Sequence, residues 1–373
     1  MSAITPSSMQ LNKLKWETTT EYNTGLDATF LKGKLRFTVD VYQKYVKDLL
    51  QPKVKMPTTI GYGNGYQISY MNSGKMTNKG WEFRVDAVPF QNKDWRVGVY
   101  FNIAHNENKI TEMPDNYIEE NYTFGNGNYA YRREEGRPMG SFYGYRYKGV
   151  YQNKDATYAR DIEGNVMKDI SGNAIVMRNG SYTVAPGDAI YEDVNHDGVI
   201  NQYDIVYLGN SNPRLTGGAG LNVSYKQFKL SAIFYGRYGQ DVVNATRLNN
   251  ESMRGIDNQS TAVLRRWRNE GDQTDIPRAL YGEGYNTLGS DRFVEDASYL
   301  RLKSLSFTYR LPKKAIQRWG FNNIDVYVTG YNLFTWTNYT GQDPEVKTEN
   351  TYAKDTATTP ASIQLVAGFN LSF

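Results

Sequence analysis

Apolar and polar residues alternate along much of this chain. In the last segment the apolar side chains fall on every second position, and only Val366 breaks the rule. They are Ile363, Leu365, Ala367, Phe369, Leu371 and Phe373, and the intervening residues are Ser362, Gln364, Gly368, Asn370 and Ser372. Because successive side chains of a β-strand point to opposite faces, this pattern predicts a strand with one apolar and one polar face.

The same alternation recurs in earlier segments, for example at Leu35, Phe37, Val39 and Val41. Strand patterns bounded by turn residues predict nine strands in all. They cover residues 18–30, 34–48, 76–88, 94–108, 214–226, 228–239, 297–311, 322–336 and 361–373. The chain is therefore expected to be all-β.

The connections between these strands alternate in length. Short links lie at residues 31–34, 89–94, 226–227 and 312–323, whereas the segments 49–75, 109–213, 240–296 and 338–360 are long, polar loops. Transmembrane β-barrels have short turns on one side of the membrane and long loops on the other, and soluble β-sandwiches follow no such rule. We therefore predict an antiparallel transmembrane barrel segment of about nine strands, with long extracellular loops and short periplasmic turns.

Composition agrees with a barrel. Hydrophobic residues are only 39% and the mean hydropathy is -0.65, yet there are 31 Tyr, 15 Phe and 6 Trp. Aromatic residues at this density argue against disorder. No apolar run approaches the roughly 20 residues of a transmembrane helix, while a barrel strand needs only about 10 alternating ones. The net charge of +4 comes from interspersed charges, which predicts no nucleic-acid partner.

Enzyme chemistry finds little support in the sequence. The chain has no cysteine and two histidines, His105 and His196, and neither has a visible nucleophile partner. We therefore predict no catalytic residues, no organic cofactor and no enzyme activity. Two smaller features are expected to be structural: the glycine-rich run 217–220 as a turn, and residues 261–269 as a short loop helix ended by Gly271.

Several short strings resemble the SusC/RagA-like family of TonB-dependent outer-membrane transporters, in the order of that family. The match covers most of the chain and ends on an aromatic residue, Phe373. The strings are Leu14-Lys15-Trp16-Glu17-Thr18-Thr19, Asn78-Lys79-Gly80-Trp81-Glu82, Ser141-Phe142-Tyr143-Gly144-Tyr145, Arg266-Trp267, Ser298-Tyr299-Leu300-Arg301-Leu302-Lys303 and Gly341-Gln342-Asp343-Pro344-Glu345.

The resemblance implies that residues 1–373 are the C-terminal portion of a 22-stranded barrel, with the plug domain and signal peptide absent. It also implies a place in the outer membrane, against lipid, and a role in importing oligosaccharides or oligopeptides. The implied partners are a SusD-like surface lipoprotein, the N-terminal barrel and plug portion, and the TonB complex acting through the plug.

Residues 193–204, inside the large loop insertion 109–213, match a calcium-loop pattern. The ligands would be Asp193, Asn195, Asp197, the Val199 carbonyl and Asp204, with Asn201 reaching the ion through water. Gly198 stands where such loops turn sharply. The pattern predicts Ca²⁺ binding, and an Asx-rich turn held by its own hydrogen bonds is the alternative.

Aromatic residues are concentrated in the same insertion. They are Tyr117, Tyr122, Phe124, Tyr129, Tyr131, Phe142, Tyr143, Tyr145, Tyr147 and Tyr151. Such rings could stack on sugars or grip a peptide. Packing within the loops and the interfacial aromatic girdle is the favoured interpretation.

Two other function classes are compatible with a β-rich chain carrying a calcium motif. One is a secreted calcium-dependent glycan-binding or adhesion protein, and the other, much less favoured, is a glycoside hydrolase. A barrel keeps its apolar faces toward lipid and needs detergent, while a lectin-like domain stays soluble without it.

Overall fold

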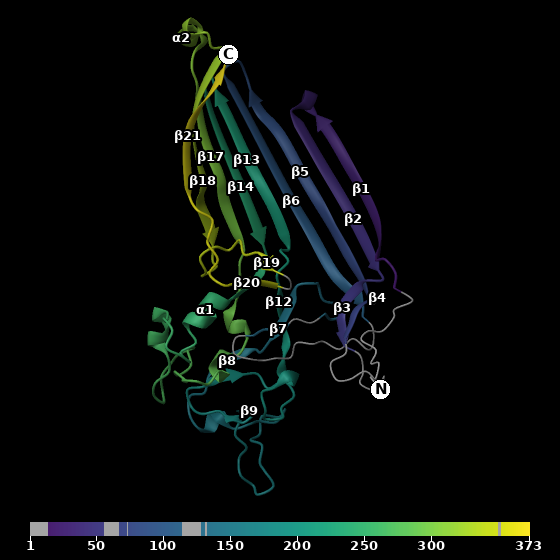
Figure 1. The fold of residues 1–373 in the computed structure, drawn as a ribbon, viewed down its shortest axis with the longest axis vertical. Helices are drawn as coiled ribbons and strands as arrows, with labels where there is room; N and C mark the ends of the chain where they lie inside the picture. The colour runs from purple at the N-terminus through teal and green to yellow at the C-terminus, as the bar shows by residue number, and fades with distance from the viewer. Residues whose placement is uncertain (1–13, 56–66, 73, 114–127, 131–132, 350–351) are drawn as a thin grey trace, which may run out of the picture.

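Nine long strands form one antiparallel sheet in the computed structural model, which describes residues 14–55, 67–72, 74–113, 128–130, 133–349 and 352–373 (Figure 1). The sheet order is β1-β2-β5-β6-β13-β14-β17-β18-β21, so each strand pairs with the next long strand along the chain. The strands are β1 (Thr18–Phe30), β2 (Leu35–Lys47), β5 (Lys75–Gln91), β6 (Trp95–Glu112), β13 (Leu215–Tyr225), β14 (Phe228–Tyr238), β17 (Tyr299–Arg310), β18 (Asn323–Thr337) and β21 (Gln364–Ser372).

The nine predicted strands and their all-β, antiparallel arrangement are confirmed, with bounds shifted by a few residues. The predicted turn at residues 217–220 is wrong, because this run lies inside β13. A Cβ on Gly217 would come within 2.6 Å of the Asn102 carbonyl oxygen on the neighbouring strand, so this position requires glycine because two backbones approach closely.

The register gives the sheet two chemically different faces. The outer positions of paired strands carry apolar side chains, as where Val328 lies opposite Phe307 and Ala367. We call this the apolar face. The opposite positions form the polar face, where Arg84 lies opposite Thr38 and Asn102. Many large apolar side chains on the apolar face are solvent-exposed, which fits a surface made for lipid.

All short connections lie at one end of the sheet, together with the C-terminus, and we call it the turn end (Figure 1). It includes the 3-10 helices η1 (Leu31–Gly33) and η8 (Gln317–Trp319) and the helix α2 (Lys313–Ile316). The long connections gather at the other end, the loop end. None of the helices among the described residues is long and apolar enough to cross a membrane.

The long connections contain short strands and helices of their own. They contain β3 (Leu50–Lys55), β4 (Gln67–Asn72), β7 (Ser141–Gly144), β8 (Tyr147–Val150), β9 (Arg178–Asn179), β10 (Tyr182–Thr183), β11 (Ala189–Tyr191), β12 (Val206–Asn210), β15 (Asp241–Asn244), β16 (Val294–Asp296), β19 (Thr348–Glu349) and β20 (Tyr352–Asp355). Helical elements are η3 (Asp155–Thr157), η4 (Gln202–Asp204), α1 (Ala245–Asn250), η5 (Thr261–Arg265), η6 (Tyr285–Thr287) and η7 (Asp291–Phe293). The expected loop helix is therefore the shorter η5.

Described residues of 128–213, 240–297 and 338–361 pack together beyond the sheet, and we call them the outer unit. Its main cluster joins Tyr143, Tyr145, Tyr191 and Tyr285 with apolar residues from distant parts of the chain. Among the described residues, most of the large, fully buried side chains, such as Phe142 and Phe293, belong to this unit, and Ile110 of β6 is an exception in the sheet. The loop end is thus a packed structure with its own core.

Candidate functional site

Charged side chains on the polar face of the sheet are held by neighbours. Arg84 contacts Asp86 at 2.7 Å, Lys44 contacts Glu21 at 3.3 Å, and Arg310 contacts Asp325 at 2.7 Å. Because these pairs are largely exposed, each contributes little to stability. Their effect is to line this face with fixed, hydrated charge, as expected of a barrel interior.

Three tyrosines on the polar face lie against glycines of the adjacent strand. Tyr42 is paired with Gly80, Tyr100 with Gly220, and Tyr327 with Gly368. A Cβ on Gly220 would meet the Tyr100 ring at 2.0 Å, and one on Gly368 would meet the Tyr327 hydroxyl oxygen at 2.7 Å. The glycines therefore leave the space that lets each ring lie flat along the wall.

A pocket of about 750 Å³ opens where the polar face meets the loop end. Arg237 of β14 forms its wall, and the segment after β18 supplies both acidic and basic side chains together with threonines. The acidic and basic residues that line it are Arg237, Asp343, Glu345, Lys347 and Lys354. Charges of both signs can therefore meet a bound molecule in this pocket.

Two residues of β17 hold the acidic side of this pocket in place. Arg301, only 2% exposed, donates to Glu345 at 2.9 Å and also pairs with Asp343. Lys303 reaches Glu345 at 2.8 Å. Burial disfavours the charge of Asp343, but hydrogen bonds from the Ala361 and Glu345 N–H groups and the Arg301 guanidinium hold its pKa below the usual range. Asp343 is therefore ionised at neutral pH.

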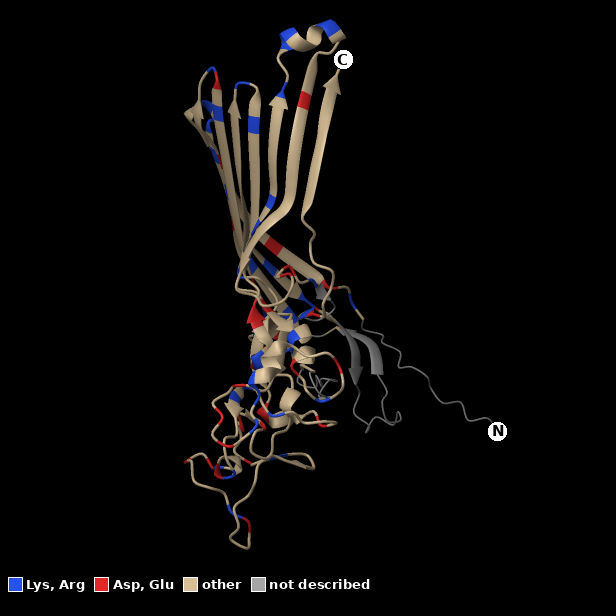
Figure 2. Ribbon diagram, turned by 90° about the vertical axis from the view of Figure 1, so that its left-hand side faces the viewer, with Lys and Arg blue, Asp and Glu red and all other residues tan. Residues whose placement is uncertain are grey.

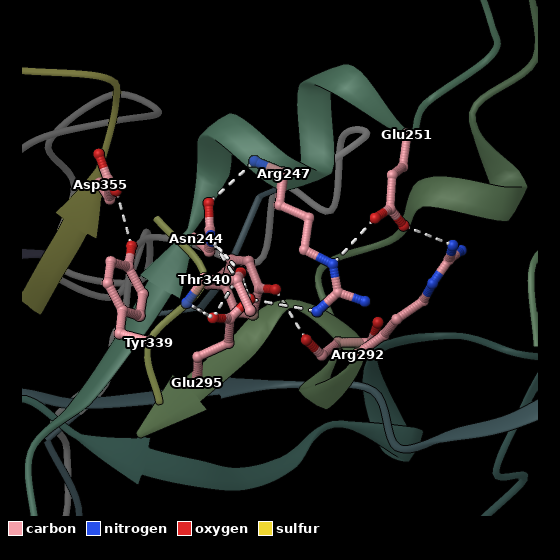
Figure 3. A network of polar contacts seen from close by, with 10 residues as sticks. Asn244, Arg247, Glu251, Arg292, Glu295, Tyr339, Thr340 and Asp355 are labelled. Atoms are coloured by element: carbon pink, nitrogen blue, oxygen red, sulfur yellow. Dashed lines mark hydrogen bonds and ion pairs between the residues drawn. The ribbon is translucent and has the colours of Figure 1, made fainter. Parts of the chain in front are cut away.

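A second polar network lies within the outer unit and connects α1 with η7 and β16 (Figure 3). Arg247 of α1 lies between Glu251 at 2.9 Å and Glu295 at 3.1 Å, and Arg292 pairs with Glu251 at 2.8 Å. Asn244 accepts a hydrogen bond from the Arg247 N–H and caps α1. The network links residues that are 41 to 48 positions apart in sequence.

The network continues into the segment that follows β18. Thr340 donates its N–H to Glu295 at 2.9 Å, and the Tyr339 hydroxyl donates to Asp355 at 2.7 Å (Figure 3). Burial raises the pKa of Tyr339 far above its usual value, so the hydroxyl keeps its proton and remains a donor. These bonds fix the segment that carries the charged pocket.

The aromatic residues of the large insertion that lie within the described residues pack inside the outer unit. Tyr129, Phe142, Tyr143, Tyr145 and Tyr151 are buried, which confirms the packing interpretation for them. Tyr147 is partly buried and packs against the main cluster, and its hydroxyl donates to the Asp275 carbonyl at 2.6 Å. Tyr117, Tyr122, Phe124 and Tyr131 lie outside the described residues.

The predicted calcium residues share one loop, where hydrogen bonds hold them. Asp193 accepts from the N–H groups of Asp197 at 3.2 Å and Gly198 at 2.8 Å. The two carboxylate oxygens of Asp204, which is fully buried, accept from the Val194 and Asn201 N–H groups at 2.8 Å. Asn195 donates to Asp197 at 2.9 Å.

These bonds agree with the Asx-rich turn, and the Val199 carbonyl also accepts a hydrogen bond, from the Asn201 amide at 3.0 Å. In the part of the chain that the structure describes, no three His, Cys, Asp or Glu side chains are grouped closely enough to hold a metal ion between them. Calcium binding at residues 193–204 therefore stays a prediction.

The two histidines lie far from any arrangement suited to catalysis. The His105 ring is on the apolar face beside Trp81 and contacts the Arg214 carbonyl oxygen at 2.6 Å. His196 is partly buried in the calcium-type loop, and its ring lies 3.3 Å from the Arg160 carbonyl oxygen. Neither ring contacts a serine, threonine or lysine side chain among the hydrogen bonds of the described residues.

Residues 3–333 match the family described as "TonB dependent receptor-like, beta-barrel". The chain belongs to this family. The match accounts for the two-faced sheet, the short turns and the long loops together. It places the TonB-dependent receptor segment in the outer membrane and confirms that it is not an enzyme, because the family consists of transporters and receptors.

Known relatives give the same result. TonB-dependent receptor P3 of Formosa agariphila is 32% identical over 346 residues, which are 91% of this chain and 32% of that protein. TonB-dependent receptor SusC of Bacteroides thetaiotaomicron is 29% identical over 369 residues, 96% of this chain and 32% of SusC. These matches confirm the predicted resemblance.

A solved structure of the RagAB peptide transporter is similar in fold. It has a TM-score of 0.73 and 27% identity, and the similarity covers 100% of this chain and 38% of that one. The TonB-dependent receptor segment thus spans about a third of the length of its relatives. The alternative of a secreted adhesion protein is not favoured by any of these similarities.

Proposed function

We propose that this chain forms part of the wall and mouth of an importer of oligosaccharides or oligopeptides in the outer membrane. The observation that carries the proposal is the charged pocket where the polar face of the sheet meets the outer unit. The apolar face would lie against lipid, and the polar face would line the passage. The outer unit would meet the substrate first.

Other parts of the transport system would come from outside this chain. The N-terminal barrel strands and plug would complete the channel, TonB would act on the plug, and a SusD-like surface lipoprotein would cover the outer unit. The relative SusC is described as a TonB-dependent receptor, which supports the role of TonB. The RagAB structure is described as a peptide transporter, which supports the peptide alternative.

The charges of the pocket also suit a peptide. A peptide carries an amino group and a carboxylate, which Asp343 or Glu345 and Lys347 or Lys354 could pair with in turn. A neutral oligosaccharide would instead use the pocket's threonines as hydrogen-bonding partners.

Uptake by cells that carry the complete transporter would test the proposal. Cells with and without the transporter, and with and without TonB, would receive a mixture of oligopeptides and neutral oligosaccharides, and loss from the medium would be followed by mass spectrometry. We expect depletion of one class only when both transporter and TonB are present. Equal depletion in all four strains would contradict the proposal.

Variants of the pocket would locate the contact. Because hydrogen bonds to charged groups contribute about 1.5 to 3 kcal/mol, Arg237→Gln with Lys354→Gln should reduce peptide uptake about tenfold or more. Lys154→Gln with Lys168→Gln, which removes two exposed charges of the outer unit away from the pocket lining, should leave uptake unchanged.

We also propose that residues 193–204 bind Ca²⁺. Burial raises the pKa of Asp204, and the nearby carboxylates of Asp193 and Asp197 raise it further, against hydrogen bonds from the Asn201 and Val194 N–H groups. A carboxyl whose pKa is raised by folding costs stability when it ionises, and a bound cation would remove that cost.

Calorimetry on the assembled protein would test calcium binding. We expect a dissociation constant of about 0.1 to 1 mM, which suffices outside the cell. Asp193→Ala or Asp197→Ala should abolish binding and expose the loop to protease, whereas Asp169→Ala, in another Asx turn of the outer unit, should do neither. Absence of binding at millimolar Ca²⁺, with protease resistance unchanged by a chelator, would leave only the Asx-turn interpretation.

A further inference from the structure

The turns at the turn end carry charge of almost one sign. We call residues 31–34, 92–94, 226–227 and 311–322 the turn rim. Its basic residues are Lys32, Lys34, Lys93, Lys226, Lys313, Lys314 and Arg318, and its acidic residue is Asp94. Figure 2 shows the basic residues at the strand tips and on α2. Every one of these basic residues is exposed.

The basic side chains of the turn rim lack acidic partners. Within the described residues, none of the seven takes part in an ion pair. The nearby Arg310 is different, because it is paired with Asp325. The turn rim is therefore a surface with excess positive charge available to a partner.

The longest turn concentrates this charge on an ordered support. Ile316 of α2 is fully buried and fixes the helix against the end of the sheet. Lys313, Lys314 and Arg318 point into solvent around it, and the Arg318 guanidinium lies 5.1 Å from the centre of the Trp319 ring. Trp319 is itself 52% exposed.

The turn rim lies next to the aromatic edge of the apolar face. Phe30, Phe90, Trp95 and Phe228 are exposed where their strands meet the turns. In barrels such aromatic residues mark the level where lipid tails give way to headgroups. The cations of the turn rim would therefore stand at headgroup level, on the periplasmic side.

We propose that the turn rim binds the headgroups of anionic phospholipids, with the α2 turn as the main contact. Charge complementarity selects this partner, because seven exposed cations against one carboxylate would meet the phosphates of the adjoining leaflet. Each Lys or Arg close to an anionic membrane surface contributes about a fivefold gain in binding. The proposal requires a place in the outer membrane but no particular substrate.

Lipid retention by the complete transporter would test the proposal. The protein, purified in detergent, would be titrated with phosphatidylglycerol or with phosphatidylcholine, and bound lipid would be counted by native mass spectrometry. We expect phosphatidylglycerol to bind more tightly and its binding to weaken with salt. Lys313→Gln with Lys314→Gln and Arg318→Gln should weaken it about fivefold for each charge removed.

A matched variant tests whether lipid binding depends on the turn rim or only on the total charge of the protein. Lys154→Gln with Lys168→Gln and Arg265→Gln removes three exposed charges from the outer unit, so it should leave phosphatidylglycerol binding unchanged. Inorganic phosphate should compete only weakly, because it cannot reach the rim and the aromatic edge together. Equal loss in both triple variants, or equal retention of the two lipids, would overturn the proposal.

Folding and transport are checked independently. The triple variant at Lys313, Lys314 and Arg318 should keep its heat-dependent gel mobility and its TonB-dependent uptake, because all three side chains are exposed at the turn end, away from the charged pocket. Failure of the uptake experiment would thus leave the lipid result intact, and loss of lipid binding would leave the proposed import untouched. If the triple variant does not assemble, single Lys→Gln changes at 313 and 314 give the same test at about fivefold each.

Discussion

Leu365 and Gln364 are adjacent in β21 but face different surroundings. Leu365 lies on the apolar face, opposite Gly330 near the middle of β18, and Gln364 lies on the polar face. Because arginine on the lipid side of a barrel costs about 2 to 4 kcal/mol at the midplane, Leu365→Arg should destabilise the assembled barrel by that amount. Gln364→Arg should cost far less.

Urea titration, with the folded fraction determined from gel mobility without heating, would measure both variants in the complete barrel. The assignment of the two faces would be wrong if the protein tolerated arginine equally at positions 364 and 365.

Gly220 tests the contact between tyrosine and glycine. A methyl group there would collide with the Tyr100 ring, so Gly220→Ala should cost about 1 to 3 kcal/mol through overpacking. In a Tyr100→Ala background the same change should cost much less, and the double-mutant cycle would give the interaction free energy. Gly98→Ala is the control, because its new Cβ would find no atom closer than 3.9 Å.

At the scale of elements, Glu251 connects α1 with η7. It is 5% exposed and pairs with Arg247 and Arg292, so Glu251→Gln would leave a buried guanidinium without its counter-charge. The free energy of unfolding of the outer unit should fall by about 3 to 5 kcal/mol. Glu192→Gln also removes a glutamate between two basic residues, but its side chain is 30% exposed, and the change should cost about 0 to 1 kcal/mol.

Protease digestion of the outer unit would compare these two variants. Glu251→Gln should open the outer unit to cleavage at lower temperature while the barrel strands stay resistant. Similar digestion of both variants would mean that the network in Figure 3 does not stabilise the outer unit.

The strands could be predicted from the sequence because apolar and polar residues alternate at every second position within each strand. The outer unit has no such local signal. Its contacts join Tyr145 with Tyr191, and Arg278 with Asp188 at 2.7 Å, across 46 to 90 positions, and no period in the sequence encodes those distances. The density of tyrosines between 142 and 151 indicated packing, but not which partners would be packed against.

The polar sites show the same limit. The calcium-type loop was visible because all its residues lie within one stretch of twelve. The charged pocket was not, because Arg237 belongs to β14 and Lys354 to β20, and the two line one pocket only when the outer unit has packed against the sheet. The segment from Gly341 to Glu345 resembles the family in sequence, but its ion pairs with Arg301 depend on the fold.

For the whole molecule, the sheet is open, with β1 and β21 each paired on one side only. Unpaired backbone groups in hydrocarbon cost several kcal/mol each. We therefore expect this chain expressed alone to aggregate, or to require the remaining strands, and not to form pores in planar bilayers. A heat-modifiable monomer that conducts ions would contradict this account.

The strand β17 shifts its register at Lys303 relative to both neighbours. Between Lys303 and the turn end, odd-numbered residues such as Leu305 and Phe307 lie on the apolar face. Between Lys303 and the loop end, even-numbered residues such as Leu300 lie there. A bulge of this kind bends a strand and increases its twist. Because of this one extra residue, β17 can bend near the loop end while its apolar side chains remain on the apolar face. The shift also places Arg301 on the polar face, where it contacts Glu345 instead of lipid.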